Sequence, residues 1–165
     1  MANIEKDKPV VYMISGQIGS GKTTYAKKLE HKTGAIRFSP DEWMLKLYPE
    51  LPSNNNFDFY YYRCCEVLWD ISKKILQKGI SVILDYGFWK LDDRETYRMK
   101  IEELGYCSKL FYVKCGYGTI KKRLHHRNEE NTPGAIKITD QDFTFFSPGF
   151  EAPSKNENFI LINNT

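Results

Sequence analysis

The chain has 165 residues, of which 41% are hydrophobic and 15% aromatic, and its formal net charge is +3. This length and composition predict one globular domain over residues 1–165 and exclude a disordered chain. The small charge gives no indication of a nucleic-acid partner, and no apolar run is long enough to span a membrane.

Residues 1–8 form a short polar N-terminal tail. Glu5, Lys6, Asp7 and Lys8 stand where a secretory signal peptide needs an apolar stretch. The four cysteines show no C-x-x-C spacing, which is typical of reduced thiols and not of a zinc site. These features favour a cytoplasmic protein.

A phosphate-binding loop follows the first predicted strand. Residues 10–14 are β-branched and apolar, as in a buried strand. Residues 16–23 read GQIGSGKT, which fits G-x-x-x-x-G-K-[ST]. Residues 23–30 have apolar positions at helical spacing, and Gly34 is a natural helix end. Strand, glycine-rich loop and helix are therefore in the order that nucleotide binding needs.

The residue types of this loop suit ATP and Mg²⁺. Glycines let the backbone bring its N–H groups close to phosphate oxygens, and a helix start favours an anion. Lys22 is expected to reach the β- and γ-phosphates, and the Thr23 hydroxyl to contact Mg²⁺. The predicted nucleotide-binding residues are Gly16, Gln17, Ile18, Gly19, Ser20, Gly21, Lys22, Thr23 and Thr24.

Asp41 lies just after the second predicted strand, residues 35–38. The sequence of residues 39–42 predicts a helix start in which Ser39 is the cap and Glu42 its partner. One interpretation of Asp41 is a carboxylate that stabilises this helix start. The other is a functional residue at the carboxyl edge of the sheet, where open α/β folds bind ligands.

A long helix is predicted from about residue 58 to residue 78, after a polar loop at residues 52–56. Its start is rich in aromatic residues. These rings either pack the helix onto the sheet or stack on a base or an aromatic substrate. They are Phe57, Phe59, Tyr60, Tyr61 and Tyr62.

The third predicted strand, residues 81–85, ends in Asp85. An apolar run followed by an acid is typical of the strand that supplies the Mg²⁺-side carboxylate in phosphate-loop proteins. Alternatively, Asp85 is a turn former. Asp92 is expected to cap the next helix. Arg94 and Arg98 on that helix form a solvated face, unless the substrate lies over the helix start.

The fourth predicted strand, residues 110–113, leads into a basic helix over residues 119–128. Arg123 and Arg127 are four residues apart and so share one face. This face is either solvated or an arginine pair that stabilises a phosphoryl group in transfer. The segment of about 119–140 is the predicted lid. A short helix capped by Thr139 and a last strand at residues 159–162 follow.

Alternating strands and helices predict an α/β fold with a parallel sheet and helices on both faces. With these motifs, the chain resembles the small P-loop kinase superfamily. The most similar group comprises compact AAA-type kinases related to polynucleotide 5′-kinase, chloramphenicol phosphotransferase and zeta-toxin kinases. The resemblance covers most of the chain and implies a five-stranded sheet of order 2-3-1-4-5. It rests on residues 16–23, 39–42, 83–89, 123–128 and 150–153.

The resemblance implies an ATP-dependent kinase with an alcohol group as acceptor. Asp41 matches the acid that accepts the hydroxyl proton, and Arg127 or Arg123 matches the lid arginine. Polynucleotide kinases of this type carry an arginine shortly after the acid, where this chain has Trp43-Met44-Leu45. A small-molecule acceptor is therefore favoured over nucleic acid. The alternatives are a polynucleotide 5′-hydroxyl kinase and a non-catalytic ATP-binding switch protein.

Overall fold

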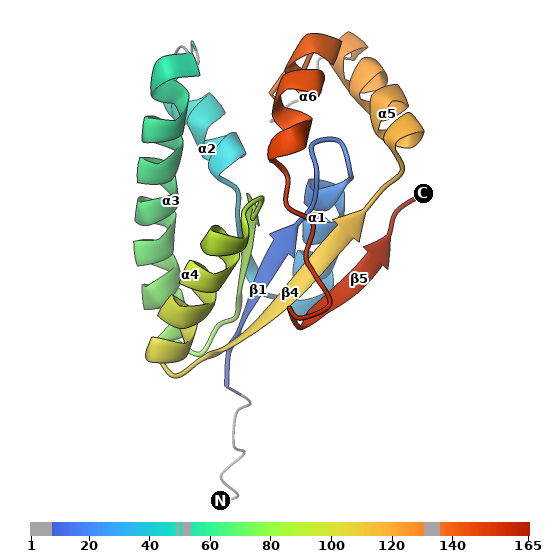
Figure 1. The fold of residues 1–165 in the computed structure, drawn as a ribbon. Helices are drawn as coiled ribbons and strands as arrows, with labels where there is room; N and C mark the ends of the chain where they lie inside the picture. The colour runs from blue at the N-terminus through green and yellow to red at the C-terminus, as the bar shows by residue number, and fades with distance from the viewer. Residues whose placement is uncertain (1–7, 49, 51–53, 131–135) are drawn as a thin grey trace, which may run out of the picture.

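A single five-stranded parallel sheet organises the chain (Figure 1). The computed structural model describes residues 8–48, 50, 54–130 and 136–165. The sheet order is β2-β3-β1-β4-β5, which confirms the predicted fold and strand order. The strands are β1 (Val10–Ser15), β2 (Ile36–Phe38), β3 (Val82–Gly87), β4 (Cys107–Lys114) and β5 (Phe159–Asn163).

Helices connect consecutive strands, as parallel pairing requires. None of the described helices is long and apolar enough to cross a membrane. The helices are α1 (Lys22–Thr33), α2 (Pro40–Leu47), α3 (Asn54–Leu76), α4 (Leu91–Glu103), α5 (Tyr117–Glu129), α6 (Asp140–Phe146) and the 3₁₀ helix η1 (Ser147–Gly149).

The two faces of the sheet bury separate apolar clusters. Along β1, Val11 and Met13 point into the cluster that includes residues of α2, α3 and α4. The alternating residue Ile14 points into the cluster that includes Ala26 and Leu29 of α1. This alternation is the period of two expected of a strand that is buried on both faces. Figure 1 shows α3 and α4 on one side of the sheet and α1 on the other.

Two local predictions about helix starts are wrong, and a third, the Ser39 cap, is confirmed in position but not in its side-chain contact. Helix α3 begins at Asn54, so residues 54–56 are helical and not a polar loop. Ser39 is the N-cap of α2 by position, but its side chain makes no capping hydrogen bond. Asp92 lies inside the first turn of α4, whose N-cap is Lys90, and the Glu151 carboxylate accepts from Leu91 N at 2.9 Å. In contrast, the predicted Thr139 cap is confirmed, with Asp142 completing a capping box.

Parts of some predictions lie outside the described residues. Residues 1–7 of the predicted tail and residues 52–53 of the predicted polar loop are among them, as are residues 131–135 of the predicted lid. The described part of the lid segment comprises α5 and the residues from 136 to α6. The loops that leave β1, β2, β3 and β4 all start from the carboxyl edge of the sheet, which is where open α/β sheets bind ligands.

Candidate functional site

The phosphate loop connects the end of β1 to the start of α1. Gly16 N donates to Gly87 O at 3.3 Å, so the loop is joined to the end of β3. Gly21 has a φ of 92°, a left-handed conformation that a residue with a side chain rarely adopts. In the described part of the chain, no hydrogen bond uses the N–H groups of Ile18, Gly19 or Gly21. Free backbone donors at a helix start form a site that favours an anion.

Three side chains from later in the chain contact this loop. Ser20 O accepts a hydrogen bond from Asn164 Nδ2 at 2.7 Å and another from Arg123 Nη1 at 3.3 Å. Gln17 Nε2 donates to Ser147 Oγ at 3.1 Å, which joins the loop to η1. The loop conformation therefore depends on α5, on η1 and on the C-terminal end of the chain.

Lys22 is the first residue of α1, and its Nζ donates to Gln17 O at 2.8 Å. Burial lowers the pKa of Lys22, while the nearby carboxylates of Asp85 and Asp41 act in the opposite direction. The positive charge of Arg127 lowers this pKa further. These effects place four predicted site residues within one electrostatic cluster, although they come from α1, α2, β3 and α5.

Asp41 is the second residue of α2 and remains exposed to water. Protein atoms that displace part of this water raise the pKa of Asp41 to about 6, an effect that Lys22 and Arg127 oppose and Asp85 reinforces. Asp41 makes no hydrogen bond or ion pair with any residue that the structure describes. Its carboxylate is therefore not used as a helix cap.

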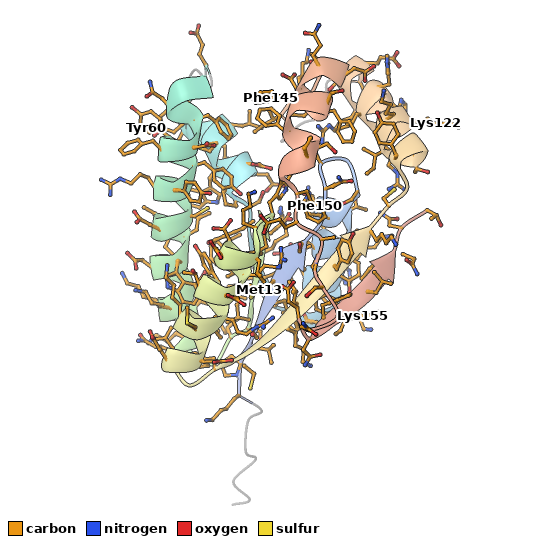
Figure 2. All side chains as sticks on the ribbon, in the orientation of Figure 1. Met13, Tyr60, Lys122, Phe145, Phe150 and Lys155 are labelled. Carbon is orange, nitrogen blue, oxygen red and sulfur yellow. The ribbon has the colours of Figure 1, made fainter. Side chains whose placement is uncertain are left out.

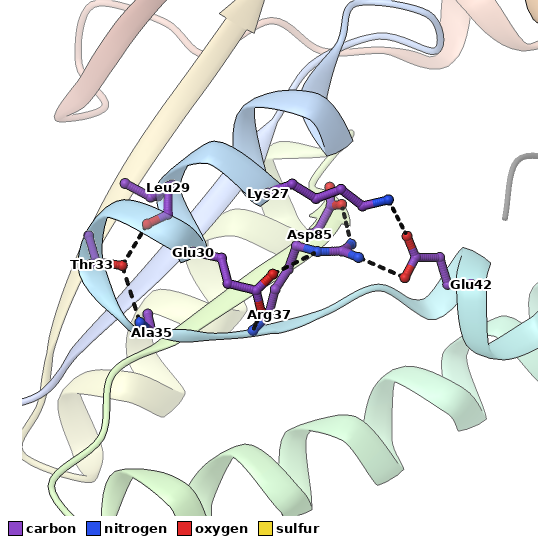
Figure 3. A network of polar contacts seen from close by, with 8 residues as sticks. All are labelled: Lys27, Leu29, Glu30, Thr33, Ala35, Arg37, Glu42 and Asp85. Atoms are coloured by element: carbon purple, nitrogen blue, oxygen red, sulfur yellow. Dashed lines mark hydrogen bonds and ion pairs between the residues drawn. The ribbon is translucent and has the colours of Figure 1, made fainter. Parts of the chain in front are cut away.

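Asp85 lies inside β3, which continues to Gly87, so the strand does not end at the acid as predicted. Its carboxylate accepts a hydrogen bond from Arg37 Nη1 at 3.0 Å (Figure 3). Burial raises the pKa of Asp85, and the charges of Lys22 and Arg37 oppose that rise. A hydrogen bond from the Thr23 hydroxyl opposes it too, so the two predicted Mg²⁺ ligands are close together.

The donor set at Thr23 and Asp85 fits Mg²⁺. Hydroxyl and carboxylate oxygens are hard ligands, and Mg²⁺ beside a nucleotide takes its other ligands from phosphates and water. In the described residues no group of three or more His, Cys, Asp or Glu side chains could hold a metal ion.

Arg37 on β2 was missed by the sequence analysis. Its Nη2 lies 2.7 Å from Glu42 Oε2, and its backbone N donates to Glu30 Oε1 at 2.9 Å (Figure 3). Lys27 Nζ lies 3.4 Å from the other Glu42 oxygen. Glu42 is therefore engaged by two cations and does not serve as the capping partner of Ser39. A charged residue between two apolar residues of a short strand was the signal that could have indicated this network.

The two arginines of α5 have different environments. Arg123 Nη1 contacts the phosphate loop at Ser20 O and lies 3.4 Å from Cys115 Sγ. Arg127 Nη2 donates to Ile136 O at 2.9 Å. Burial lowers the pKa of Arg127, and the charge of Asp41 opposes this. By contrast, Lys122 is exposed and lies on the outer side of α5 (Figure 2).

Arg94 does not belong to a solvated face, contrary to the prediction. It is 1% exposed and binds Glu157 through two hydrogen bonds of 2.6 and 2.9 Å.

The aromatic residues at the start of α3 fall into two groups. Phe57, Tyr60 and Tyr61 pack against the core, while Phe59 and Tyr62 are exposed. Tyr61 also donates to Tyr86 O at 2.8 Å.

The model of the AAA domain family matches residues 11–146. No curated protein matches the chain significantly.

Solved structures with the same fold include several kinases. A predicted kinase from Chloroflexus aurantiacus J-10-fl has a TM-score of 0.74 at 17% identity, covering 96% of this chain and 90% of its own. Kti12 from Chaetomium thermophilum, solved with ADP-AlF3, has a TM-score of 0.71 at 17% identity. The match covers 93% of this chain and 87% of the Kti12 chain. A gluconokinase from Sinorhizobium meliloti 1021 has a TM-score of 0.64 at 15% identity. The match covers 95% of this chain and 83% of the gluconokinase chain. The chain therefore belongs to the AAA domain family and has the fold of the small P-loop kinases.

Proposed function

We propose that this protein is an ATP-dependent phosphotransferase that transfers the γ-phosphate of ATP to a hydroxyl group of a small molecule. The observation that carries the proposal is a phosphate loop with backbone N–H donors unused among the described residues, and with Lys22 close enough to Asp41, in the first turn of α2, for their charges to affect each other. Lys22 belongs to the phosphate loop, and Asp41 is a carboxylate without a structural partner among the described residues. A base beside a phosphate-binding lysine is the pairing that transfer to a hydroxyl requires.

The loop would bind the triphosphate. The free N–H groups of Ile18, Gly19 and Gly21 are donors for phosphate oxygens. Lys22 would leave the Gln17 carbonyl and bind the β- and γ-phosphates. Thr23 and Asp85 are the residues that would hold Mg²⁺ with its water ligands. When bound, this ion neutralises negative charge on the phosphates.

Asp41 would orient the acceptor hydroxyl and take its proton. With a pKa of about 6, this carboxylate is mostly ionised at pH 7 and close to the range in which a general base works well. The acceptor oxygen forms a bond to the γ-phosphorus while the bond from that phosphorus to the β–γ bridging oxygen breaks. Most of the rate would come from positioning and electrostatics.

The surroundings of the two arginines support separate roles. Arg127 is electrostatically coupled to Asp41 and Lys22, which suits a lid arginine that neutralises the phosphoryl group in transfer. Arg123 supports the loop backbone through Ser20 O. The four cysteines are free thiols, as is usual in reducing compartments, and this supports a cytoplasmic location.

A phosphorylation screen tests the proposal. Sugars, other hydroxyl-bearing metabolites, antibiotics and oligonucleotides are incubated with ATP and Mg²⁺, and products are followed by ³¹P NMR and mass spectrometry. We expect at least one phosphorylated small molecule with the wild type and none with Lys22→Ala. If ATP is only hydrolysed, and only when a partner protein is added, the switch alternative replaces the enzyme. A phosphorylated oligonucleotide as the sole product would favour a polynucleotide kinase.

A further inference from the structure

The turn that follows β3 has an unusual backbone. Gly87 has a φ of 81°, and the next residue, Phe88, has a φ of 43°. Phe88 is the one non-glycine residue with a positive φ among the described residues. An aromatic residue in this conformation is unfavourable and persists only where surrounding contacts impose it, which happens most often at functional sites.

Four hydrogen bonds to the carbonyl groups of Phe88 and Trp89 impose this conformation. Phe88 O accepts from Ser15 Oγ at 3.0 Å and from Arg94 Nη1 at 3.0 Å. Trp89 O accepts from Glu151 N at 2.9 Å and from Arg94 Nη1 at 3.4 Å. Arg94 is in turn fixed by its two hydrogen bonds to Glu157, and both residues are buried. A buried ion pair thus fixes the turn that carries Trp89.

The indole of Trp89 and the side chain of Lys22 approach Gly87 from the same side. A Cβ atom added at Gly87 would lie 3.1 Å from Trp89 Cδ1, 3.2 Å from Trp89 Nε1 and 3.7 Å from Lys22 Cε. Gly87 is also joined to the phosphate loop through the hydrogen bond from Gly16 N. The indole therefore lies beside the lysine of the phosphate loop.

The indole ring also contacts a second aromatic residue. It makes an edge contact with Phe150, with ring centroids 5.8 Å apart and an interplanar angle of 83°. Phe150 lies on the segment that runs from α6 across the sheet (Figure 2). Trp89 is half-buried, and its Nε1–H donates to no residue in the part of the chain that the structure describes. An indole nitrogen can only donate, so it suits an oxygen atom of a ligand.

We propose that Trp89 is a catalytic residue whose indole N–H donates a hydrogen bond to an oxygen of the phosphoryl group in transfer. The inference rests on the proposed function. Charge spreads over the equatorial oxygens of that group, and fixed donors beside Lys22 stabilise it without reorganising. The imposed turn at Phe88 has the role of holding the donor in place.

Binding of a transition-state mimic tests this role. ADP with aluminium fluoride imitates the phosphoryl group in transfer, and calorimetry compares its affinity with that of ADP alone in the presence of Mg²⁺. Trp89→Phe keeps an aromatic ring against Phe150 and removes the N–H. We expect this variant to lose about tenfold or more of the preference for the mimic, while its affinity for ADP stays within about twofold of the wild type.

The control variant is Trp69→Phe, which alters a buried ring that packs against Tyr97 on α4. It should keep the full preference for the mimic. A Trp89→Phe variant that also keeps the full preference would overturn the role of Trp89 and leave the proposed function intact. A wild type that binds ADP with and without aluminium fluoride equally well would overturn the proposed function, and this inference with it.

Fluorescence gives an independent test that does not alter Trp89. The chain has three tryptophans, so Trp43→Phe combined with Trp69→Phe leaves Trp89 as the only one. Adding aluminium fluoride to the ADP complex should shift or quench its emission beyond the effect of ADP alone. Emission that does not respond to the mimic, in a protein that binds it, would place Trp89 outside the site and refute the proposal.

Discussion

The guanidinium of Arg37 lies 3.0 Å from the carboxylate of Asp85, and both side chains are almost completely buried. The same guanidinium binds Glu42, the neighbour of Asp41 in the first turn of α2. Arg37 therefore joins the strand that carries the predicted Mg²⁺-side acid to the helix that carries the predicted base. Because it contacts neither the phosphate loop nor Asp41 by hydrogen bond, we consider it a positioning residue.

Replacing Arg37 with Gln should destabilise the protein by roughly 3 kcal/mol, because it leaves the buried Asp85 carboxylate without the guanidinium that hydrogen-bonds it. Urea unfolding measures this change. The matched control is Arg63→Gln, whose ion pair with Glu66 is exposed on both sides and should contribute less than about 0.5 kcal/mol. Equal effects of the two substitutions would show that the Arg37 network does not stabilise the fold.

Lys22→Ala should abolish phosphoryl transfer and leave the fold intact. The hydrogen bond that Lys22 makes in the described structure goes to Gln17 O in its own loop, so the substitution breaks no hydrogen bond to another element. The measurements are turnover, calorimetry with ATP and Mg²⁺, and the melting temperature. Turnover equal to that of the wild type would contradict the role of the phosphate loop.

The arginines of α5 should respond differently to replacement by Ala. Arg127→Ala should lower kcat by about 10²-fold or more, because the charge that it meets is largest in the transition state. Arg123→Ala should mainly raise the KM for ATP, because Arg123 supports the loop at Ser20 O.

Steady-state kinetics of the two α5 variants separate these effects, with the exposed Lys122→Ala as the control. Wild-type kcat in both arginine variants would mean that neither arginine stabilises the phosphoryl group in transfer. A larger loss of kcat in Arg123→Ala than in Arg127→Ala would reverse the two assignments.

The phosphate loop and the alternation along β1 could be predicted from the sequence because both depend on residues close together in the chain. The sheet order followed from the family resemblance. The contacts of Arg37 and Arg94 could not be predicted, since their partners Asp85 and Glu157 are 48 and 63 residues away. When its partner is unknown, an arginine on a helix, such as Arg94, is most simply interpreted as solvated.

The capping contacts predicted for Glu42 and Asp92 are absent for a similar physical reason. Ser39 and Glu42 match a local capping signature, but Glu42 is drawn to Arg37 on a neighbouring strand. At α4, the first free N–H is satisfied by Glu151, 60 residues later, so no cap by Asp92 is needed. Local signatures predict what a segment prefers alone, and long-range charged partners override that preference.

The last prediction concerns Asp41 and the pH dependence of both rate and stability. If Asp41 is the base, turnover of the wild type should rise as pH increases through about 6, since only the ionised carboxylate accepts a proton. Asp41→Asn should lower kcat by roughly 10²–10⁴-fold and remove this rise, while ATP still binds. A mutant with normal turnover on the true acceptor would show that Asp41 is not the base.

The contribution of Asp41 to stability should change with pH in the opposite direction to its contribution to turnover. Because the pKa of Asp41 is raised from 3.8 to about 6 in the folded protein, the folded state holds its proton more tightly than the unfolded state. The stability that Asp41 contributes is therefore present below pH 4 and is lost as pH rises to about 6. Asp41→Asn has no such loss, so its stability relative to the wild type should improve between pH 4 and pH 6. Melting temperatures of both proteins across this range measure the difference. A helix-start carboxylate with a lowered pKa would give the reverse trend, with Asp41→Asn becoming relatively less stable as pH rises.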